Sequence, residues 1–255
     1  MKIKKKVARG FKEKSHIGLA NCVGAIDGML LWIHKPNKND LEDNIGFGPK
    51  NFFCGRKKKF GLNMMGTCDS RGYFMDVEIR FPGSSSDFCA FLNSSLKKKL
   101  EQVFFLANGL CLYGDNAYVN TPYMVVPFKG SVDESKVNYF HSSLRINIEC
   151  AFGILVHRWG ILRKPIPVNI TIQKTTSLLM CLCKLHNFCI HESESIVQPL
   201  MKDVINIRME GGFALSNFDR NETSWSYEQN EDRVEDLLDV GQHFGDITRN
   251  ARRTA

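Results

Sequence analysis

Three acidic residues stand in sequence positions where a carboxylate would be costly without a nearby cation. Asp27 lies within an apolar run, Asp115 closely follows another, and Glu149 borders the apolar face of a long helical pattern. A buried carboxylate destabilises a fold unless it is paired or bound to a metal ion. Since carboxylate oxygens are natural ligands of Mg²⁺, the three acids together predict a site for divalent cations.

Such a site would suit phosphodiester cleavage. Two metal ions roughly 3.5–4 Å apart can activate an attacking water or 3′-hydroxyl and stabilise the leaving oxygen. Each acid alone is also typical of a cap, a turn or a surface, so the metal interpretation depends on their order of strand, strand and helix. We predict that Asp27, Asp115 and Glu149 are catalytic and hold two divalent ions, Mg²⁺ or Mn²⁺.

The elements that must position these acids can be read from hydrophobic patterns. Four apolar runs bounded by turn residues predict strands at Cys22–Ile33, Phe60–Cys68, Tyr73–Arg80 and Leu110–Tyr113. The segment Asp69-Ser70-Arg71-Gly72 suits a tight turn between the second and third strands, which would form an antiparallel hairpin. The first strand would carry Asp27, and the last would deliver Asp115 at its carboxyl end.

Helical spacing of apolar residues predicts three helices, at Phe88–Leu100, about Tyr139–Trp159 and about Ile172–His191. Ser84, Ser85, Ser86 and Asp87 offer N-caps to the first helix, and an N-cap is the role we expect for Asp87, with a supporting role beside the three acids as the alternative. The pattern as a whole predicts an α/β fold with a mixed sheet of about five strands. Three strands would form an antiparallel meander, with helices on both faces.

Bulk properties describe the kind of protein and its partners. The 255 residues carry a formal net charge of +7, which suits a polyanionic partner. Nine scattered cysteines form no disulfide framework and favour a reducing compartment. No run approaches the roughly 20 apolar residues that span a bilayer, so we expect no membrane segment.

We expect three regions along the chain. Residues 1–20 form a basic arm or nuclear-import patch, residues 21–191 form the folded domain, and residues 192–255 form a polar, loosely attached tail. Within the tail, a short acidic amphipathic stretch around Val234–Val240 is the exception to the polar pattern.

Several basic residues are candidates for contact with a nucleic-acid backbone: Arg56, Lys57, Lys58, Arg145, Arg158 and Arg163. Arg145 precedes Glu149 by one helical turn, so it would orient that carboxylate, bind a phosphate or form a plain ion pair. For the others the alternative is a solvated surface.

A group of thiols and imidazoles near the end of the last predicted helix raises the question of zinc: Cys181, Cys183, His186, Cys189 and His191. These residues alternate with leucines on one helix, whereas structural zinc usually joins two separate segments. We therefore expect core cysteines, with His186 making a hydrogen bond that packs the helix.

Five short motifs, in order, resemble the DDE endonuclease domain of Harbinger-type transposases and their domesticated relatives. They are Gly24–Gly28, Gly55-Arg56-Lys57, Pro82-Gly83-Ser84 with Asp87, Gly114–Tyr118 and Ile148–Gly153. The resemblance extends from about Asn21 to Ile190 and implies a ribonuclease-H-like fold. It also implies that Asp27 bridges both metal ions, Asp115 binds one and Glu149 the other. The pair Asn116-Ala117 departs from the Ser-Gly found in many members but leaves the carboxylate in place.

The resemblance implies a metal-dependent DNA endonuclease with strand-transfer activity, acting on double-stranded DNA in the nucleus after synthesis in the cytoplasm. Many family members carry a helical DNA-binding segment before the position of Asn21, so we expect a truncated chain or a separate Myb-like DNA-binding partner. A homo-oligomer is a further expectation. Two alternatives stay open, namely a catalytically silent domesticated transposase that binds DNA or recruits proteins, and a two-metal phosphoesterase acting on RNA or a hybrid.

Overall fold

The computed structural model of the chain describes residues 2–15, 19–41, 46–102, 105–106, 109–128, 132–167 and 171–192. The expected tail lies outside the described residues from position 193 onward, and so does the short helix expected around Val234–Val240. Within the described ranges, no helix is long and apolar enough to cross a membrane.

Six strands of the described chain form one mixed sheet. They are β1 (Cys22–Trp32), β2 (Phe53–Cys54), β3 (Lys59–Cys68), β4 (Phe74–Pro82), β5 (Cys111–Tyr113) and β6 (Met124–Val125). The order is β2-β3-β1-β5-β6, and β4 also pairs with β3. Strand β3 pairs antiparallel with both β1 and β4, whereas β5 pairs parallel with both β1 and β6. This arrangement matches the mixed sheet expected from the sequence and is consistent with a ribonuclease-H-like fold.

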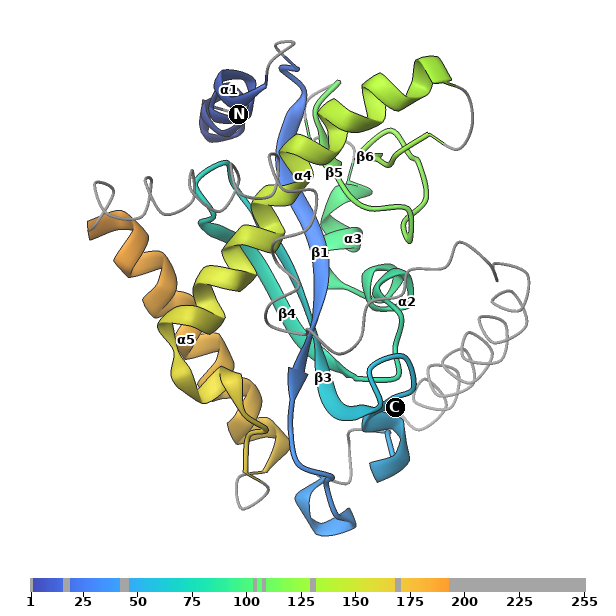
Figure 1. Ribbon diagram of the computed structural model, residues 1–255, viewed down its shortest axis with the longest axis vertical. Coiled ribbons are helices and arrows are strands. Elements are labelled where there is room, and N and C mark those ends of the chain that lie inside the picture. Colours follow the sequence, from blue (N-terminus) through green and yellow to red (C-terminus); the bar gives the residue numbers. More distant parts are fainter. Residues whose placement is uncertain are drawn as a thin grey trace. The chain divides into compact units, whose positions relative to one another are not determined.

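Helices cover both faces of the sheet. They are α1 (Lys2–Lys14), α2 (Asp87–Leu92), α3 (Ser95–Leu100), α4 (Val132–Arg158) and α5 (Ile172–Glu192), with short 3₁₀ turns at Lys38–Asp40, Pro49–Phe52 and Gly160–Arg163. Helix α4 runs diagonally across the sheet with α5 beside it (Figure 1). The helices α4 and α5 share one hydrophobic cluster with β1, whereas α2 and α3 share a second cluster that includes Val23 and Ile26 of the same strand.

The predicted hairpin is confirmed between β3 and β4, and its turn has the expected chemistry. Both the Arg71 and the Tyr73 backbone N–H groups donate to the Asp69 carboxylate, at 2.8 and 3.0 Å. Gly72 has a φ of +81°, a left-handed conformation that glycine adopts without a steric penalty. The turn residues therefore specify where β3 ends and β4 begins.

The helix predicted at Phe88–Leu100 is instead two short helices. Ser94 interrupts it, because its hydroxyl accepts a hydrogen bond from the Lys97 N–H at 2.9 Å and donates one to the Phe91 carbonyl at 2.7 Å. A serine side chain that bonds to nearby backbone groups competes with continued helix and favours a new N-cap. Ser94 thus ends α2 and starts α3.

The N-terminal segment also differs from the expected basic arm, because Lys2–Lys14 forms helix α1 and packs against β1. Phe11 is fully buried, and Ala8 is 6% exposed. Lys14 donates hydrogen bonds to the Ser70 carbonyl and to the Asn147 side chain, which tie α1 to the hairpin turn and to α4. The spacing of four between Val7 and Phe11 was the available signal, and the surrounding lysines obscured it.

Helix α5 docks onto the start of β4 through two adjacent polar residues. Asn187 accepts a hydrogen bond from the Phe74 N–H and donates one to the Phe74 carbonyl, both at 2.8 Å. The His186 ring lies 4.9 Å from the Phe74 ring, and its Nε2 is 3.1 Å from the Gly72 carbonyl. These side chains of α5 thereby satisfy backbone groups where the β3–β4 register shifts.

The contact with Arg158 sets the protonation state of His186. Arg158 Nη1 lies 3.1 Å from His186 Nδ1, and a guanidinium can only donate. His186 Nδ1 must therefore accept, which leaves the proton on Nε2, where it is donated to Gly72. Burial, together with the positive charge of Arg158, lowers the pKa of His186 to about 4, although the hydrogen bond to Gly72 raises it. Buried, neutral His186 is the packing residue that the sequence predicted.

We predict that His186 makes the fold acid-sensitive. Its pKa is lower in the folded chain than the ordinary value of 6.5, so its contribution to stability is complete above pH 6.5 and is lost as the pH falls toward 4. The loss should reach about 3 kcal/mol. Urea unfolding at pH 7, 6, 5 and 4 should show a pH slope that His186→Gln reduces, whereas His191→Gln, at a residue whose side chain is 78% exposed, should keep it. Equal slopes for all three proteins would contradict the prediction.

Candidate active site

The sheet places Asp27 and Asp115 beside one another through the pairing of β1 and β5. The last parallel pair between these strands is Ala25 with Tyr113. Asp27 and Asp115 each lie two residues beyond that pair, where β5 ends and β1 continues with β3 as its only paired strand. In sheets with parallel strands, the carboxyl ends of strands are the usual place for a ligand site.

Helix α4 brings Glu149 to the same place because Gly66 allows it to approach the sheet. Gly66 of β3 pairs with Asp27 of β1. A Cβ atom on residue 66 would lie 2.9 Å from the ring of Phe152 and 3.5 Å from Ile148, both on α4. The helix therefore packs directly on the strand at the level of Asp27, and Glu149 follows Ile148 on that turn.

Arg145 joins two of the three acids. Its Nη1 lies 2.5 Å from Glu149 Oε1 and 3.5 Å from Asp27 Oδ2. The three side chains are between 17% and 21% exposed. Burial lowers the pKa of Arg145, but Glu149, Asp27 and Asp115 together raise it above the usual value. The guanidinium thus provides a permanent positive charge among all three predicted acids.

One arginine does not balance the negative charge of the site. Burial, followed by the charges of Asp115 and Asp87, raises the pKa of Asp27 to about 7, although Arg145 and the Gly28 N–H, at 2.8 Å from Asp27 Oδ1, lower it. A carboxyl with a raised pKa gains from an additional cation, because the cation stabilises its charged form. The oxygen-only donor set and the excess of acid both fit divalent metal ions.

Asp87 is a fourth acid beside this group, which the sequence pattern had indicated as an N-cap. The N-cap of α2 is Ser86, whose hydroxyl accepts from the Cys89 N–H at 3.2 Å. Asp87 instead contacts Asn63, whose side chain donates to its Oδ1 at 2.9 Å. Gly28 provides the space, since a Cβ there would lie 1.8 Å from that same oxygen. In the sequence, the glycine that follows Asp27 was the signal that another side chain could approach the strand at this point.

The six predicted basic residues have different surroundings. Burial raises the pKa of Asp87, and Asn63 and Arg56 lower it, so Arg56 is close enough to Asp87 for their charges to interact. Arg145 is turned onto Asp27 and Glu149, as described above. Arg158 bonds to His186 inside the fold, and Arg163 donates to the His157 carbonyl at 2.6 Å on an exposed surface.

The candidate zinc residues do not converge. Cys181 and His191 are exposed, Cys183 is buried, and His186 has the partners given above. Over the ranges that the structure describes, no group of three or more His, Cys, Asp or Glu side chains is arranged to hold a metal ion. The same is true of the acids. Arg145 lies between Asp27 and Glu149, so metal binding would require these side chains to rearrange.

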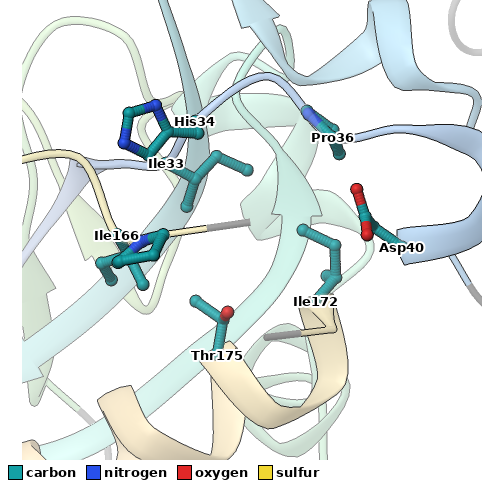
Figure 2. Close-up of a pocket in the computed structure, with 8 residues that line it drawn as sticks. Ile33, His34, Pro36, Asp40, Ile166, Ile172 and Thr175 are labelled. Carbon is teal, nitrogen blue, oxygen red and sulfur yellow. The ribbon is translucent and has the colours of Figure 1, made fainter. Parts of the chain in front are cut away.

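Two hollows lie at the opposite end of β1 from its β5 pairing. A cavity of about 10 Å³ lies among Ile33, His34, Asp40 and Ile172, too small for a substrate (Figure 2). A more open hollow of about 280 Å³ lies beside Trp32 and is also lined by Lys59, Phe60 and Pro165. Neither hollow contains one of the candidate acids.

The fold and the site define a class of protein, namely α/β proteins with a ribonuclease-H-like sheet and an acidic site beside the end of one of its parallel strands. The chain belongs to the DDE superfamily endonuclease family, whose model matches residues 26–187, more than half of the chain. The match begins one residue before Asp27 and ends at Asn187, so it contains all three predicted acids.

Several curated proteins are similar to this chain. "Putative nuclease HARBI1" of Bos taurus is 26% identical over 182 residues, covering 70% of this chain and 49% of that protein. The protein of the same name from Homo sapiens is 25% identical over the same shares. "Protein ALP1-like" of Arabidopsis thaliana is 26% identical over 201 residues, covering 72% of this chain and 47% of that protein. The chain spans about half the length of these relatives, and no solved structure matches it significantly.

We predict that Gly66 is needed to seat α4 on the acids. Gly66→Ala should destabilise the fold by about 1–3 kcal/mol, because the new methyl group would press on Phe152 in a packed core. Gly153→Ala is the matched control, since it lies on α4 with no described atom within 4 Å of its Cβ and should stabilise the helix by about 0.5–1 kcal/mol. Urea unfolding of both variants measures the difference, and a neutral Gly66→Ala would refute the close approach.

Proposed function

We propose that the chain is a metal-dependent DNA endonuclease of the Harbinger transposase lineage. The observation that carries the proposal is the grouping of Asp27 and Glu149 around Arg145, beside the end of β5, which Asp115 follows by two residues. Acidic residues from two strands and one helix are otherwise unrelated in sequence, and a fold gathers like charges only against a cost. Membership of the endonuclease family supports the same conclusion.

The residues present would hold two divalent ions, Mg²⁺ or Mn²⁺. Asp27 would contact both ions, Asp115 one and Glu149 the other. When bound, the ions supply activation of the attacking water or 3′-hydroxyl and stabilisation of the leaving oxygen. Gly28 allows the Asp87 carboxylate to approach β1, and Gly66 allows Phe152 and Ile148 of α4 to approach β3. With a 3′-hydroxyl as the nucleophile, the same site would perform strand transfer.

A second candidate is a DNA-binding descendant without catalytic activity. The contact of Arg145 with both Asp27 and Glu149 favours it, because the guanidinium already supplies a cation where the metal ions would be needed. Retention of all three acids favours the enzyme. A cleavage assay with purified protein on plasmid DNA and on RNA, with Mg²⁺ or Mn²⁺ and with EDTA, separates the two functions and tests the choice of nucleic acid.

We predict that Asp27→Asn, Asp115→Asn and Glu149→Gln each reduce metal-dependent cleavage to background while DNA binding largely survives. Each change keeps the shape of the side chain and removes the charge that would hold a metal ion. The matched control is Asp76→Asn, because Asp76 is also partly buried but pairs with Lys99 at 3.5 Å. Near wild-type turnover in any of the three variants would remove that acid from the site.

We predict that the basic turn binds phosphate groups of the DNA backbone. Replacement of Arg56, Lys57 and Lys58 by Ala should weaken binding to all duplexes alike and reduce the slope of log K against log salt by about one unit for each phosphate that is no longer neutralised. The control is the triple replacement of Lys97, Lys98 and Lys99 on α3, where Lys97 pairs with Glu101 and Lys99 with Asp76. An unchanged salt slope in the first variant would assign the turn to solvated surface.

We further propose that the chain acts in the nucleus and reaches specific DNA ends through a separate Myb-like protein. Phosphate contacts give affinity without sequence information, and specificity needs an element that reads base edges in a groove. The candidate basic residues sit on a turn, on helix α4 and on the 3₁₀ segment after it. None of them belongs to a recognised groove-reading motif.

We predict that the purified chain prefers cognate ends over random duplex by less than about a thousandfold, the lower range for specific binders. Fluorescence anisotropy at one fixed salt concentration measures both affinities. A larger preference by the chain alone would overturn the need for a partner.

A further inference from the structure

The side chain of Tyr118 is buried beside the acids, and its hydroxyl has no hydrogen-bond partner among the residues that the structure describes. The residue is 4% exposed, and the hydroxyl is fully enclosed. Its ring packs edge-on against Phe91 at 5.6 Å, and a Cβ on Gly114 would lie 2.8 Å from it. Buried hydroxyl groups are nearly always hydrogen-bonded, so an unpaired one beside an acidic group is a place where a ligand could supply the missing partner.

The Tyr118 backbone N–H donates to the Asp115 carbonyl at 3.3 Å, which holds this residue beside the second acid. Burial, and then the charges of Asp87, Asp27 and Asp115, raise the pKa of Tyr118. Phe91, which contacts the ring, follows Asp87 by one turn of α2. Residues one helical turn apart share a face, so α2 presents Asp87 and Phe91 to the same tyrosine.

Asp87 is held against β1 by specific contacts. Asn63 donates to its Oδ1 at 2.9 Å and to the Ser85 carbonyl at 3.2 Å, which fixes both the carboxylate and the start of α2. Gly28 leaves the space into which the carboxylate fits. With one oxygen bound to Asn63, the second carboxylate oxygen is available to a ligand.

We propose that Asp87 and Tyr118 complete the site, with Asp87 as a fourth carboxylate for the divalent cations and Tyr118 as the hydroxyl donor to the phosphate at the bond to be cut, once the side-chain rearrangement that metal binding requires opens the enclosed hydroxyl to the site. This inference rests on the proposed nuclease function and adds two residues to it. The structural alternative is that Asp87 only favours the N-terminus of α2 and that Tyr118 only fills the core. The proposed roles and the structural alternative predict different effects of each substitution on the stability of the metal-free protein.

The first experiment compares Asp87→Asn with Asp27→Asn and with the control Asp76→Asn. Isothermal titration with Mn²⁺ should show at least a tenfold weaker affinity for Asp87→Asn and Asp27→Asn, and wild-type affinity for Asp76→Asn. The Tm of metal-free Asp87→Asn should equal or exceed that of the wild type, because an unbalanced charge is removed. A lower metal-free Tm with unchanged Mn²⁺ affinity would assign Asp87 to helix structure and overturn the proposal.

The same titration separates this proposal from the proposed function. If Asp27→Asn loses Mn²⁺ affinity and Asp87→Asn keeps it, only the role of Asp87 fails. If the wild type binds no Mn²⁺, or if Asp27→Asn binds it as the wild type does, the nuclease assignment fails and this inference fails with it.

The second experiment compares Tyr118→Phe with Tyr113→Phe. Tyr113 donates a hydrogen bond to Asn21 at 2.8 Å, so its replacement should lower the metal-free Tm, whereas Tyr118→Phe should leave that Tm unchanged or raise it. Single-turnover cleavage at saturating DNA should fall about tenfold for Tyr118→Phe and little for Tyr113→Phe.

A double variant tests whether the two residues act together. When Tyr118→Phe is combined with Asp87→Asn, the rate should fall less than the product of the single effects, since both residues act on one ligand. A lower Tm with an unchanged rate for Tyr118→Phe would overturn its role.

Discussion

The charge balance around Arg145 is the interaction on which the site depends. Asp27 and Glu149 would repel one another if they were left unpaired in a partly buried position. The guanidinium, 2.5 Å from one carboxylate and 3.5 Å from the other, makes their approach tolerable without a metal ion. The balance is incomplete, because Asp115 and Asp87 add further negative charge. Negative charge therefore exceeds positive charge among these side chains.

Close packing at two glycines supports this arrangement. Gly66 lets α4 lie on β3 opposite Asp27, and Gly28 lets the Asp87 carboxylate approach β1 from α2. The two helices belong to different hydrophobic clusters on opposite faces of the sheet. The acids therefore lie where β1 no longer has β5 as a neighbour, because β5 ends at Tyr113. A site built this way depends on the end of β5 and on both helical layers at once.

The remainder of the described fold holds the sheet in register. Asn187 pairs with both backbone groups of Phe74, and His186 bonds to Gly72 in the hairpin turn. Arg158 bonds to His186 in the structure, and its contact with DNA stays a prediction. The hairpin contains Gly66, so the docking of α5 and the seating of α4 act on the same strands.

Hydrophobic periodicity was sufficient to predict the main strands, the long helices and the turn at Gly72, because these patterns depend on residues near in sequence. The same reasoning predicted the three acids, because a carboxylate in an apolar run is costly wherever the chain places it. It favoured an N-cap over a supporting role for Asp87, and it could not place Tyr118 beside the acids or show Arg145 between Asp27 and Glu149. Those contacts join segments that lie tens of residues apart, or more than a hundred in the case of Asp27 and Arg145. Only the packing of two helical layers on an open sheet decided them, since burial and charge depend on what surrounds a side chain in space.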